Sequence, residues 1–240
     1  MAPLFNIAAD AARAFAVLEG GGIAIVPNTI GYSILGGSPA ALARIFRTKG
    51  RAAGKRNALV ANAAWQRALH VCSSRGQEII EALTVGYDLP LGAIAPLRGE
   101  HPAIAGCDPQ MLADSTREGT IAMLLNAGPF HAALTALSFA AGRLLFGSSA
   151  NLTLSGTRFC VEEIQPDILA IADIVIDHGL QRYHPYAASS TLLDVETLRV
   201  VRHGSCFEDI AYVLHRHFGI ELARRGDGAA PVSAEPPRPG

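Results

Sequence analysis

The stretch 144–151, Leu-Leu-Phe-Gly-Ser-Ser-Ala-Asn, joins an apolar run to a cluster of small hydroxyl and amide residues. A short apolar run that ends at a glycine is typical of a strand buried within a sheet. Because open α/β sheets bind ligands at the carboxyl ends of their strands, Ser149 and Asn151 are candidate ligand-binding residues. The alternative is a plain turn or helix cap, in which serine and asparagine are favoured for their local hydrogen bonds. The Gly-x-Ser-x-Gly spacing of a nucleophile elbow is missing, which argues against a serine hydrolase.

Helix-like and strand-like segments alternate on both sides of this stretch, and such an order argues for an α/β fold. Ser38-Pro39 is a typical N-cap and first-turn pair, so a helix is expected to begin there. Apolar periodicity and turn signals predict helices at 7–18, 38–48, 77–84, around 130–141, 161–170 and 207–218. The expected strands are 23–26, 57–61, 91–96, 120–125, 143–146, 174–176, 192–194 and 198–201.

The domain organisation follows from where the composition changes. No linker and no internal repeat precede residue 220, so one domain is expected over residues 1–220. From about Arg224 onward Gly, Pro, Ala and Ser dominate. Such a segment cannot bury enough apolar surface to offset the entropy of ordering it, so residues 221–240 are expected to form a disordered C-terminal tail.

The composition, 50% hydrophobic and 17% charged, predicts a sizeable core. No run of about 18 residues is uninterrupted by charges or turn signals, so no membrane partner is expected. The N-terminus has no basic region ahead of an apolar stretch, so no signal peptide is expected either. The four cysteines are scattered, which favours free thiols over a disulfide framework or a metal site. We therefore expect a cytoplasmic protein without metal ligands or a bound prosthetic group.

Five basic residues fall within ten positions of an otherwise sparsely charged chain: Arg47, Lys49, Arg51, Lys55 and Arg56. The formal net charge is −1, so any anion site must be local. Gly50 lets the backbone approach a ligand closely, and Lys49 and Arg51 are natural partners of phosphate oxygens. The alternative is that these cations complement the dipole at the end of the preceding helix and stay solvated.

A further cluster of polar residues lies near the end of the chain. Ser190 and Thr191 enter one expected strand, and Arg202 follows the next, so these groups are candidates to close over a nucleotide. Alternatively, none of these residues binds a ligand. Thr191 would then reflect the preference of threonine for strands, Asp194 would form a turn and Arg202 would be solvated. The sequence contains neither a GxxxxGK[ST] loop nor a GxGxxG that follows a strand, which argues against P-loop and dinucleotide-binding folds.

These motifs become specific because they occur in one order with familiar spacing. In this order they resemble the YrdC-like family of threonylcarbamoyl-adenylate synthases, and the resemblance spans residues 15–217. The motifs that carry it are Pro27…Tyr32, Lys49-x-Arg51, Ser149-Ala150-Asn151-Leu-x-x-Ser-Gly156, Ser190-Thr191-x-x-Asp194 and Arg202-x-Gly204.

The resemblance implies a single α/β domain, built on a strongly twisted, largely parallel mixed sheet flanked by helices, with a concave cationic cavity. It also implies an ATP-dependent nucleotidyltransferase. In that reaction threonine and bicarbonate form a carbamate, which attacks the α-phosphate of ATP bound with Mg²⁺, and threonylcarbamoyl-AMP and pyrophosphate result. A partner transferase would then pass the threonylcarbamoyl group to tRNA, which makes RNA a further expected partner.

Residue by residue, the resemblance assigns two sides to the site. The expected acceptor-pocket residues are Asn28, Thr29 and Tyr32, and Lys49 and Arg51 are also expected to be catalytic. The expected nucleotide-binding residues are Lys49, Arg51, Ser149, Asn151, Ser190 and Arg202.

The acceptor side departs from the family pattern at three positions. The family has hydroxyl residues where this chain has Ile30 and Gly92, and an arginine where it has Leu124. Losing a charge-assisted hydrogen bond to a carboxylate costs about 1.5–3 kcal/mol. Three interpretations stay open: an active synthase with drifted motifs, a paralogue that acts on another small acceptor, and a non-catalytic module that binds a nucleotide or RNA.

Overall fold

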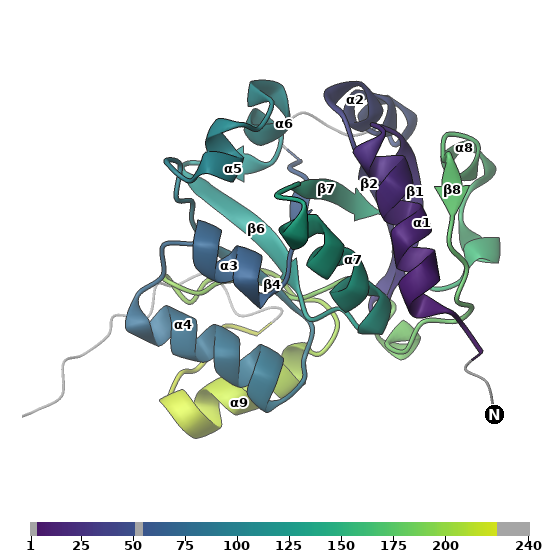
Figure 1. The fold of residues 1–240 in the computed structure, drawn as a ribbon. Coiled ribbons are helices and arrows are strands. Elements are labelled where there is room, and N and C mark those ends of the chain that lie inside the picture. Colours follow the sequence, from purple (N-terminus) through teal and green to yellow (C-terminus); the bar gives the residue numbers. More distant parts are fainter. Residues whose placement is uncertain (1–3, 51–54, 225–240) are drawn as a thin grey trace, which may run out of the picture.

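The computed structural model describes residues 4–50 and 55–224 and centres on a mixed sheet flanked by helices (Figure 1). The strands are β1 (Ile23–Asn28), β2 (Gly31–Gly36), β3 (Ala58–Val60), β4 (Leu91–Pro96), β5 (Thr116–Arg117), β6 (Thr120–Leu125), β7 (Leu145–Ser149), β8 (Ile174–Val175), β9 (Leu192–Asp194) and β10 (Val200–Arg202). The α-helices are α1 (Ile7–Glu19), α2 (Pro39–Thr48), α3 (Ala63–Leu69), α4 (Ser74–Glu81), α5 (Pro102–Ala105), α6 (Pro109–Ala113), α7 (Pro129–Ala140), α8 (Pro166–Leu169) and α9 (Phe207–Phe218).

Within the described residues the strand order is β10-β9-β4-β6-β3-β7-β2-β1-β8, and β5 pairs with β6 at the side. The predicted α/β class with a mixed, helix-flanked sheet is confirmed, but the sheet is not largely parallel. Three strand pairs are parallel (β1–β8, β3–β6 and β4–β9), whereas six are antiparallel. Short connections account for part of this, because strands joined by two residues, such as β1–β2 and β5–β6, can pair only antiparallel.

Several elements differ from the sequence prediction. Strand β2 was not expected; it follows the two-residue turn Thr29-Ile30, after which Gly31 adopts a φ of 109°. Helix α3 and the short helices α5 and α6 were also not expected. The helix expected at 161–170 is broken into a 3₁₀ turn and α8, because Pro166 has no N–H to continue the helix and is favoured in a first turn instead.

Alternation along β4 and β6 gives the sheet a core side and an open side. Met123 and Leu125 of β6 belong to the main core cluster, whereas Ala122 and Leu124 line a cavity. On β4, Ala93 is likewise in the core and its neighbour Gly92 lines the cavity. The period-2 pattern of these strands therefore produces the cavity floor directly.

Helices pack against the sheet (Figure 1). Helices α1 and α7 pack on each other and share an apolar cluster with β1, β2 and β7. Helix α2 begins where predicted, because the Ser38 hydroxyl accepts a hydrogen bond from the Ala41 N–H at 3.2 Å. It ends at Thr48, which sets Lys49 directly after its last turn.

The last core residues of the described chain are Ile220 and Leu222, which follow α9. Most of the predicted C-terminal tail, residues 225–240, lies outside the described residues. No helix in the described part of the chain is long and apolar enough to cross a membrane.

Candidate functional site

A cavity of about 710 Å³ lies on the open side of the sheet. Strands β2, β3, β4, β6, β7, β9 and β10 all contribute residues to its walls. Two of the described lining residues are acidic (Glu118 and Asp194) and six are basic, so the local charge is cationic in a chain whose formal net charge is −1. The basic lining residues are Lys49, Lys55, Arg56, Arg117, Arg199 and Arg202.

Lys49 and Ser149 meet in this cavity although 100 positions separate them. The Lys49 side chain is buried, and its Nζ donates a hydrogen bond to the Ser149 carbonyl oxygen. The Lys49 carbonyl oxygen in turn accepts from the Thr153 N–H at 3.0 Å. Strand β2 pairs with β7 beside them, so that Ser33 lies opposite Ser149. Two motifs that were ambiguous separately therefore form one wall of the cavity.

Asn151 has a buried side-chain amide whose oxygen lacks a hydrogen-bond partner. Its Nδ2 donates to the Leu152 carbonyl oxygen at 2.5 Å, while its Oδ1 has no hydrogen-bond partner. The hydroxyl of neighbouring Ser148 is also buried without a partner. Buried polar atoms are nearly always hydrogen-bonded, so both atoms are suited to bind a ligand or an ordered water.

Ser190 and Arg202 form the opposite wall. The Arg202 guanidinium donates from Nε to the Ser190 carbonyl oxygen at 3.0 Å and from Nη2 to the Ser190 hydroxyl at 3.1 Å. Gly204 makes this contact possible, because a Cβ atom there would overlap the backbone of Ser189 and Ser190. The Thr191 hydroxyl is fully buried and bonds the Ser205 carbonyl oxygen at 3.0 Å, so its role is structural.

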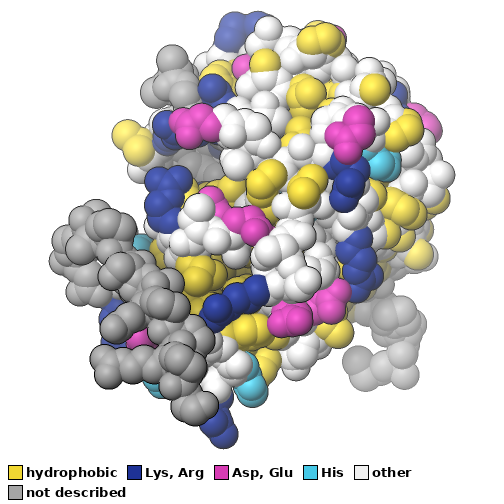
Figure 2. Space-filling view, turned by 90° about the vertical axis from the view of Figure 1, so that its left-hand side faces the viewer, with side chains coloured by type: hydrophobic (Ala, Val, Ile, Leu, Met, Phe, Trp, Pro, Cys, Tyr) yellow, Lys and Arg dark blue, Asp and Glu magenta, His cyan; other side chains and the backbone are white. Residues whose placement is uncertain are grey.

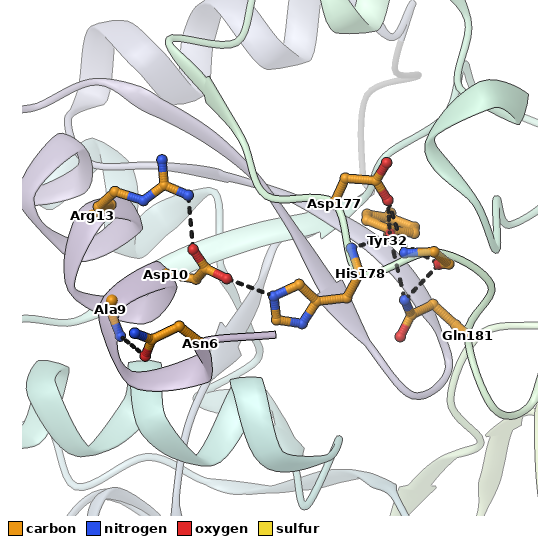
Figure 3. A network of polar contacts seen from close by, with 9 residues as sticks. Asn6, Ala9, Asp10, Arg13, Tyr32, Asp177, His178 and Gln181 are labelled. Carbon is orange, nitrogen blue, oxygen red and sulfur yellow. Dashed lines mark hydrogen bonds and ion pairs between the residues drawn. The ribbon is translucent and has the colours of Figure 1, made fainter. Parts of the chain in front are cut away.

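Tyr32, expected in the acceptor pocket, is among the residues that line the cavity, and its hydroxyl is held by the 177–181 loop (Figure 3). The hydroxyl lies 2.9 Å from the Gly179 carbonyl oxygen and 3.1 Å from Asp177 Oδ1, and it accepts from the His178 N–H at 3.0 Å. Burial raises the pKa of this phenol far above its usual range. His178 also contacts Asp10 of α1 at 2.9 Å, so the network ties the 177–181 loop to two elements of the fold.

The other two expected acceptor residues are also held by the fold. Asn28 is buried and donates to the Ser33 hydroxyl at 2.7 Å, and Thr29 donates its N–H to the Ala127 carbonyl oxygen at 2.9 Å. Neither belongs to the described residues that line the cavity. Arg51, expected to bind phosphate, lies outside the described residues.

Sequence reasoning missed several polar residues of the cavity, including Ser33, Ser115, Arg117, Thr120 and Arg199. The alternation of Thr120 with Ala122 and Leu124 along β6 was a usable signal, because residues two apart share a face of the sheet. Ser33 carried no such signal, since β2 itself was not predicted.

The three departures from the family pattern meet on the apolar part of the cavity. Ile30 and Leu124 are both buried and form a small cluster with Ala127, against which Tyr183 packs. Gly92 is paired with Leu124 across β4 and β6. This part of the cavity therefore has no polar side chain at the three positions where two hydroxyls and a cation were expected from the resemblance.

The protein was compared with known sequences and structures. The family model Sua5/YciO/YrdC, described as "Telomere recombination", matches residues 16–204. No curated protein matches the sequence.

Three solved structures have a similar fold at low identity. The hypothetical protein smu.1377c of Streptococcus mutans is 20% identical with a TM-score of 0.71, over 90% of this chain and 94% of that one. YciO of E. coli is 20% identical with a TM-score of 0.64, over 82% and 90%. P. abyssi Sua5, solved with L-threonine, is 21% identical with a TM-score of 0.66, over 89% of this chain but only 58% of Sua5.

These structural likenesses, all under 25% identity, establish the fold. The family model covers most of the chain and includes every motif named above, from Pro27 to Gly204. The chain therefore belongs to the Sua5/YciO/YrdC family.

Proposed function

We propose that this protein is a nucleotidyltransferase of the threonylcarbamoyl-adenylate synthase class. Its substrates would be ATP, carried in with Mg²⁺, bicarbonate and an amino acid. The amine of the amino acid adds to bicarbonate with loss of water and gives a carbamate. A carbamate oxygen then bonds to the α-phosphorus of ATP while the bond to the bridging oxygen of the β-phosphate breaks, and pyrophosphate leaves with that electron pair.

This reaction requires positioning and charge neutralisation more than a carboxylate pair. Lys49, together with Arg51, would neutralise the phosphates, and Arg202 with Ser190 would close the opposite wall. The free Oδ1 of Asn151 is an acceptor, so it fits a hydroxyl or amine of the nucleoside rather than a phosphate oxygen. Each group thus has a distinct part in holding the triphosphate in line for attack.

The observation that carries the proposal is the buried Lys49 beside Ser149 in a cationic cavity. Six of the described lining residues are basic and two are acidic, and such a cationic wall favours an anionic ligand such as a triphosphate. The fold that this chain shares with Sua5, whose structure was solved with L-threonine, supports an amino acid as the second substrate. The adenylate product would pass to a partner transferase that modifies tRNA.

The direct test is pyrophosphate release from ATP in the presence of bicarbonate and a panel of amino acids. Lys49→Met keeps the aliphatic stem but removes the charge, so we expect activity to fall about 10- to 150-fold, the value of one charge-assisted hydrogen bond. Arg44→Met is the matched control, since Arg44 is an exposed cation of α2, the helix that Lys49 follows, and does not line the cavity. Circular dichroism checks that both variants are folded. Pyrophosphate release that is absent, or equal in the wild type and Lys49→Met, would refute the synthase function.

A non-catalytic nucleotide- or RNA-binding module is the second candidate, and the apolar residues Ile30 and Leu124 favour it. Against broad RNA affinity, basic and acidic side chains are interspersed on the described part of the face in Figure 2. This candidate predicts calorimetric ATP binding without turnover, and RNA binding that weakens steeply with salt. If ATP does not bind at all, both candidates fail.

A further inference from the structure

A row of apolar residues crosses four neighbouring strands and forms part of the cavity floor. Leu192 of β9 pairs with Gly92 of β4, Gly92 pairs with Leu124 of β6, and Leu124 pairs with Val60 of β3. All four residues line the cavity. Because paired residues on adjacent strands point to the same face, Leu192, Leu124 and Val60 lie on one face of the sheet, and Gly92 adds no side chain between Leu192 and Leu124.

The side chain of Leu192 fills the space above Gly92. A Cβ atom at position 92 would overlap the Leu192 Cδ2 atom and would lie 2.8 Å from the Thr191 carbonyl oxygen. A side chain at position 92 would require these atoms to shift. Leu192 presents methyl groups there, and the Ser190 hydroxyl, which accepts from Arg202, lies 3.1 Å from the same point.

Ile30 extends this surface from the turn between β1 and β2. It packs with Leu124 and Ala127, and Tyr183, which is not among the residues that line the cavity, packs against this cluster. The Tyr183 hydroxyl interacts with the Cys206 thiol. The Tyr183 N–H donates to the Thr29 carbonyl oxygen at 2.9 Å, and this bond holds the backbone of Tyr183 beside the turn between β1 and β2. The apolar surface is thus held by the fold and has no polar group of its own at positions 30, 124 and 192.

The cavity is consequently amphipathic, since Lys49, Asn151 and Arg202 lie on its polar walls and the apolar row lies on its floor. A ligand that fits it carries an anionic part and a separate aliphatic group. ATP supplies the anionic part, and the acceptor is left to supply the aliphatic one.

We propose that the amino acid used by this protein has a branched aliphatic side chain, which binds on the surface of Ile30, Leu124 and Leu192. This inference rests on the proposed function, and it names the acceptor class. Threonine would bury its hydroxyl against methyl groups, whereas valine, which has the same shape, loses no hydrogen bond to water. An unpaired buried hydroxyl corresponds to about a 5- to 150-fold loss in affinity, so valine is preferred over threonine by that factor.

The test is calorimetric titration of the full chain with valine and with threonine, in the presence of saturating α,β-methylene-ATP and Mg²⁺. Ile30→Thr introduces a hydroxyl on the surface and narrows the preference for valine. Ile30→Val is the matched control, because valine and threonine are isosteric and only the hydroxyl differs between the two variants. It keeps the preference of the wild type.

The outcomes separate this inference from the proposed function. Threonine binding as tightly as valine, or no binding of either, overturns the inference; pyrophosphate release with threonine would then leave the synthase function standing. A preference for valine in binding, with no pyrophosphate released for any amino acid, supports the inference and refutes the synthase function. If Ile30→Thr and Ile30→Val changed the preference for valine over threonine equally, the inference would also be overturned. The preference would then not depend on whether the surface carries a hydroxyl.

Discussion

His131 lies fully inside the protein, next to the strand that forms the cavity floor. Its Nε2 is 3.1 Å from the carbonyl oxygen of Leu124, and it belongs to the buried polar residues of α7. Burial lowers its pKa from 6.5 to about 4, because the charged imidazolium cannot be solvated there. His70 is in the same situation, with its pKa also lowered to about 4 by burial. Both side chains are therefore neutral in the folded protein at pH 7.

This burial predicts how stability depends on pH. Between pH 6.5 and 4 the unfolded chain binds a proton at each of these histidines and the folded protein does not, so the free energy of unfolding falls as the pH is lowered. Each group contributes up to about 1.4 kcal/mol per pH unit within this window. His131→Gln keeps a donor for the Leu124 carbonyl oxygen but cannot titrate.

Urea unfolding at pH 7, 6 and 5 measures this effect. We expect a shallower loss of stability in His131→Gln than in the wild type, and a still shallower one when His70→Gln is added. Parallel pH profiles for the wild type and the double variant would contradict the assignment.

At the scale of elements, Arg202 is positioned by the contacts between residues 189–191, at the start of β9, and residues 202–205, between β10 and α9. We call this group of contacts the joint. Ser190 and Ser205 form an isolated bridge, and Gly204 lies between Arg202 and that bridge with its backbone against Ser189. The Gly204 N–H donates to the Thr191 hydroxyl at 3.1 Å. A side chain at position 204 must push these backbones apart, so the glycine of the Arg-x-Gly motif is required by space.

Gly204→Ala is accordingly expected to lower both stability and ATP affinity. Overpacking a tight site costs about 1–3 kcal/mol, and the displaced joint also moves Arg202 away from Ser190. Gly99→Ala is the matched control, because Gly99 has open space around its Cα and a backbone that any residue adopts. Thermal unfolding and ATP titration of both variants measure the effect. Full ATP affinity in Gly204→Ala would show that this joint does not position the site.

At the scale of the whole molecule, the core draws on almost the entire described chain. The main cluster begins with Ile23 of β1 and ends with Ile220 and Leu222, which follow α9. The His203 ring contacts the Ala223 carbonyl oxygen at 2.9 Å, so contacts with the fold continue to that residue. Contacts with the fold therefore extend past residue 220, the predicted end of the domain.

A chain truncated after Arg224 is expected to fold and bind ATP like the full chain. Changes outside the core alter stability by about 0.5 kcal/mol or less, which shifts the melting temperature by about 1–2 °C in a protein of this size. ATP at 100 times its dissociation constant should stabilise both chains by about 2.7 kcal/mol. Differential scanning calorimetry with and without ATP tests both statements. A melting temperature many degrees lower after truncation would mean that residues 225–240 contribute to the fold.

The sequence by itself determined most helices, most strands and the motif pairs that identify the family. Ser38-Pro39 starts α2 where expected, and the apolar runs of β4 and β6 were found with their bounds. These features depend on local propensity, on capping and on the alternation of side chains along a strand, and all three are set by residues close together in the sequence. The hairpin of β1 and β2 was not predicted, because its two-residue turn, Thr29-Ile30, is not one of the usual turn sequences.

Only the tertiary structure decided what each side chain faces. Lys49 reaches the Ser149 carbonyl oxygen from 100 positions away, and the Tyr32 hydroxyl donates to the Gly179 carbonyl oxygen 147 positions away. Leu192 occupies the space above Gly92 because β9 pairs with β4 in one register. Such contacts depend on which strands pair and how they are aligned, and a shift of one residue would turn every side chain to the other face. For that reason the sequence predicted an anion site, while the apolar floor beside it came from the fold.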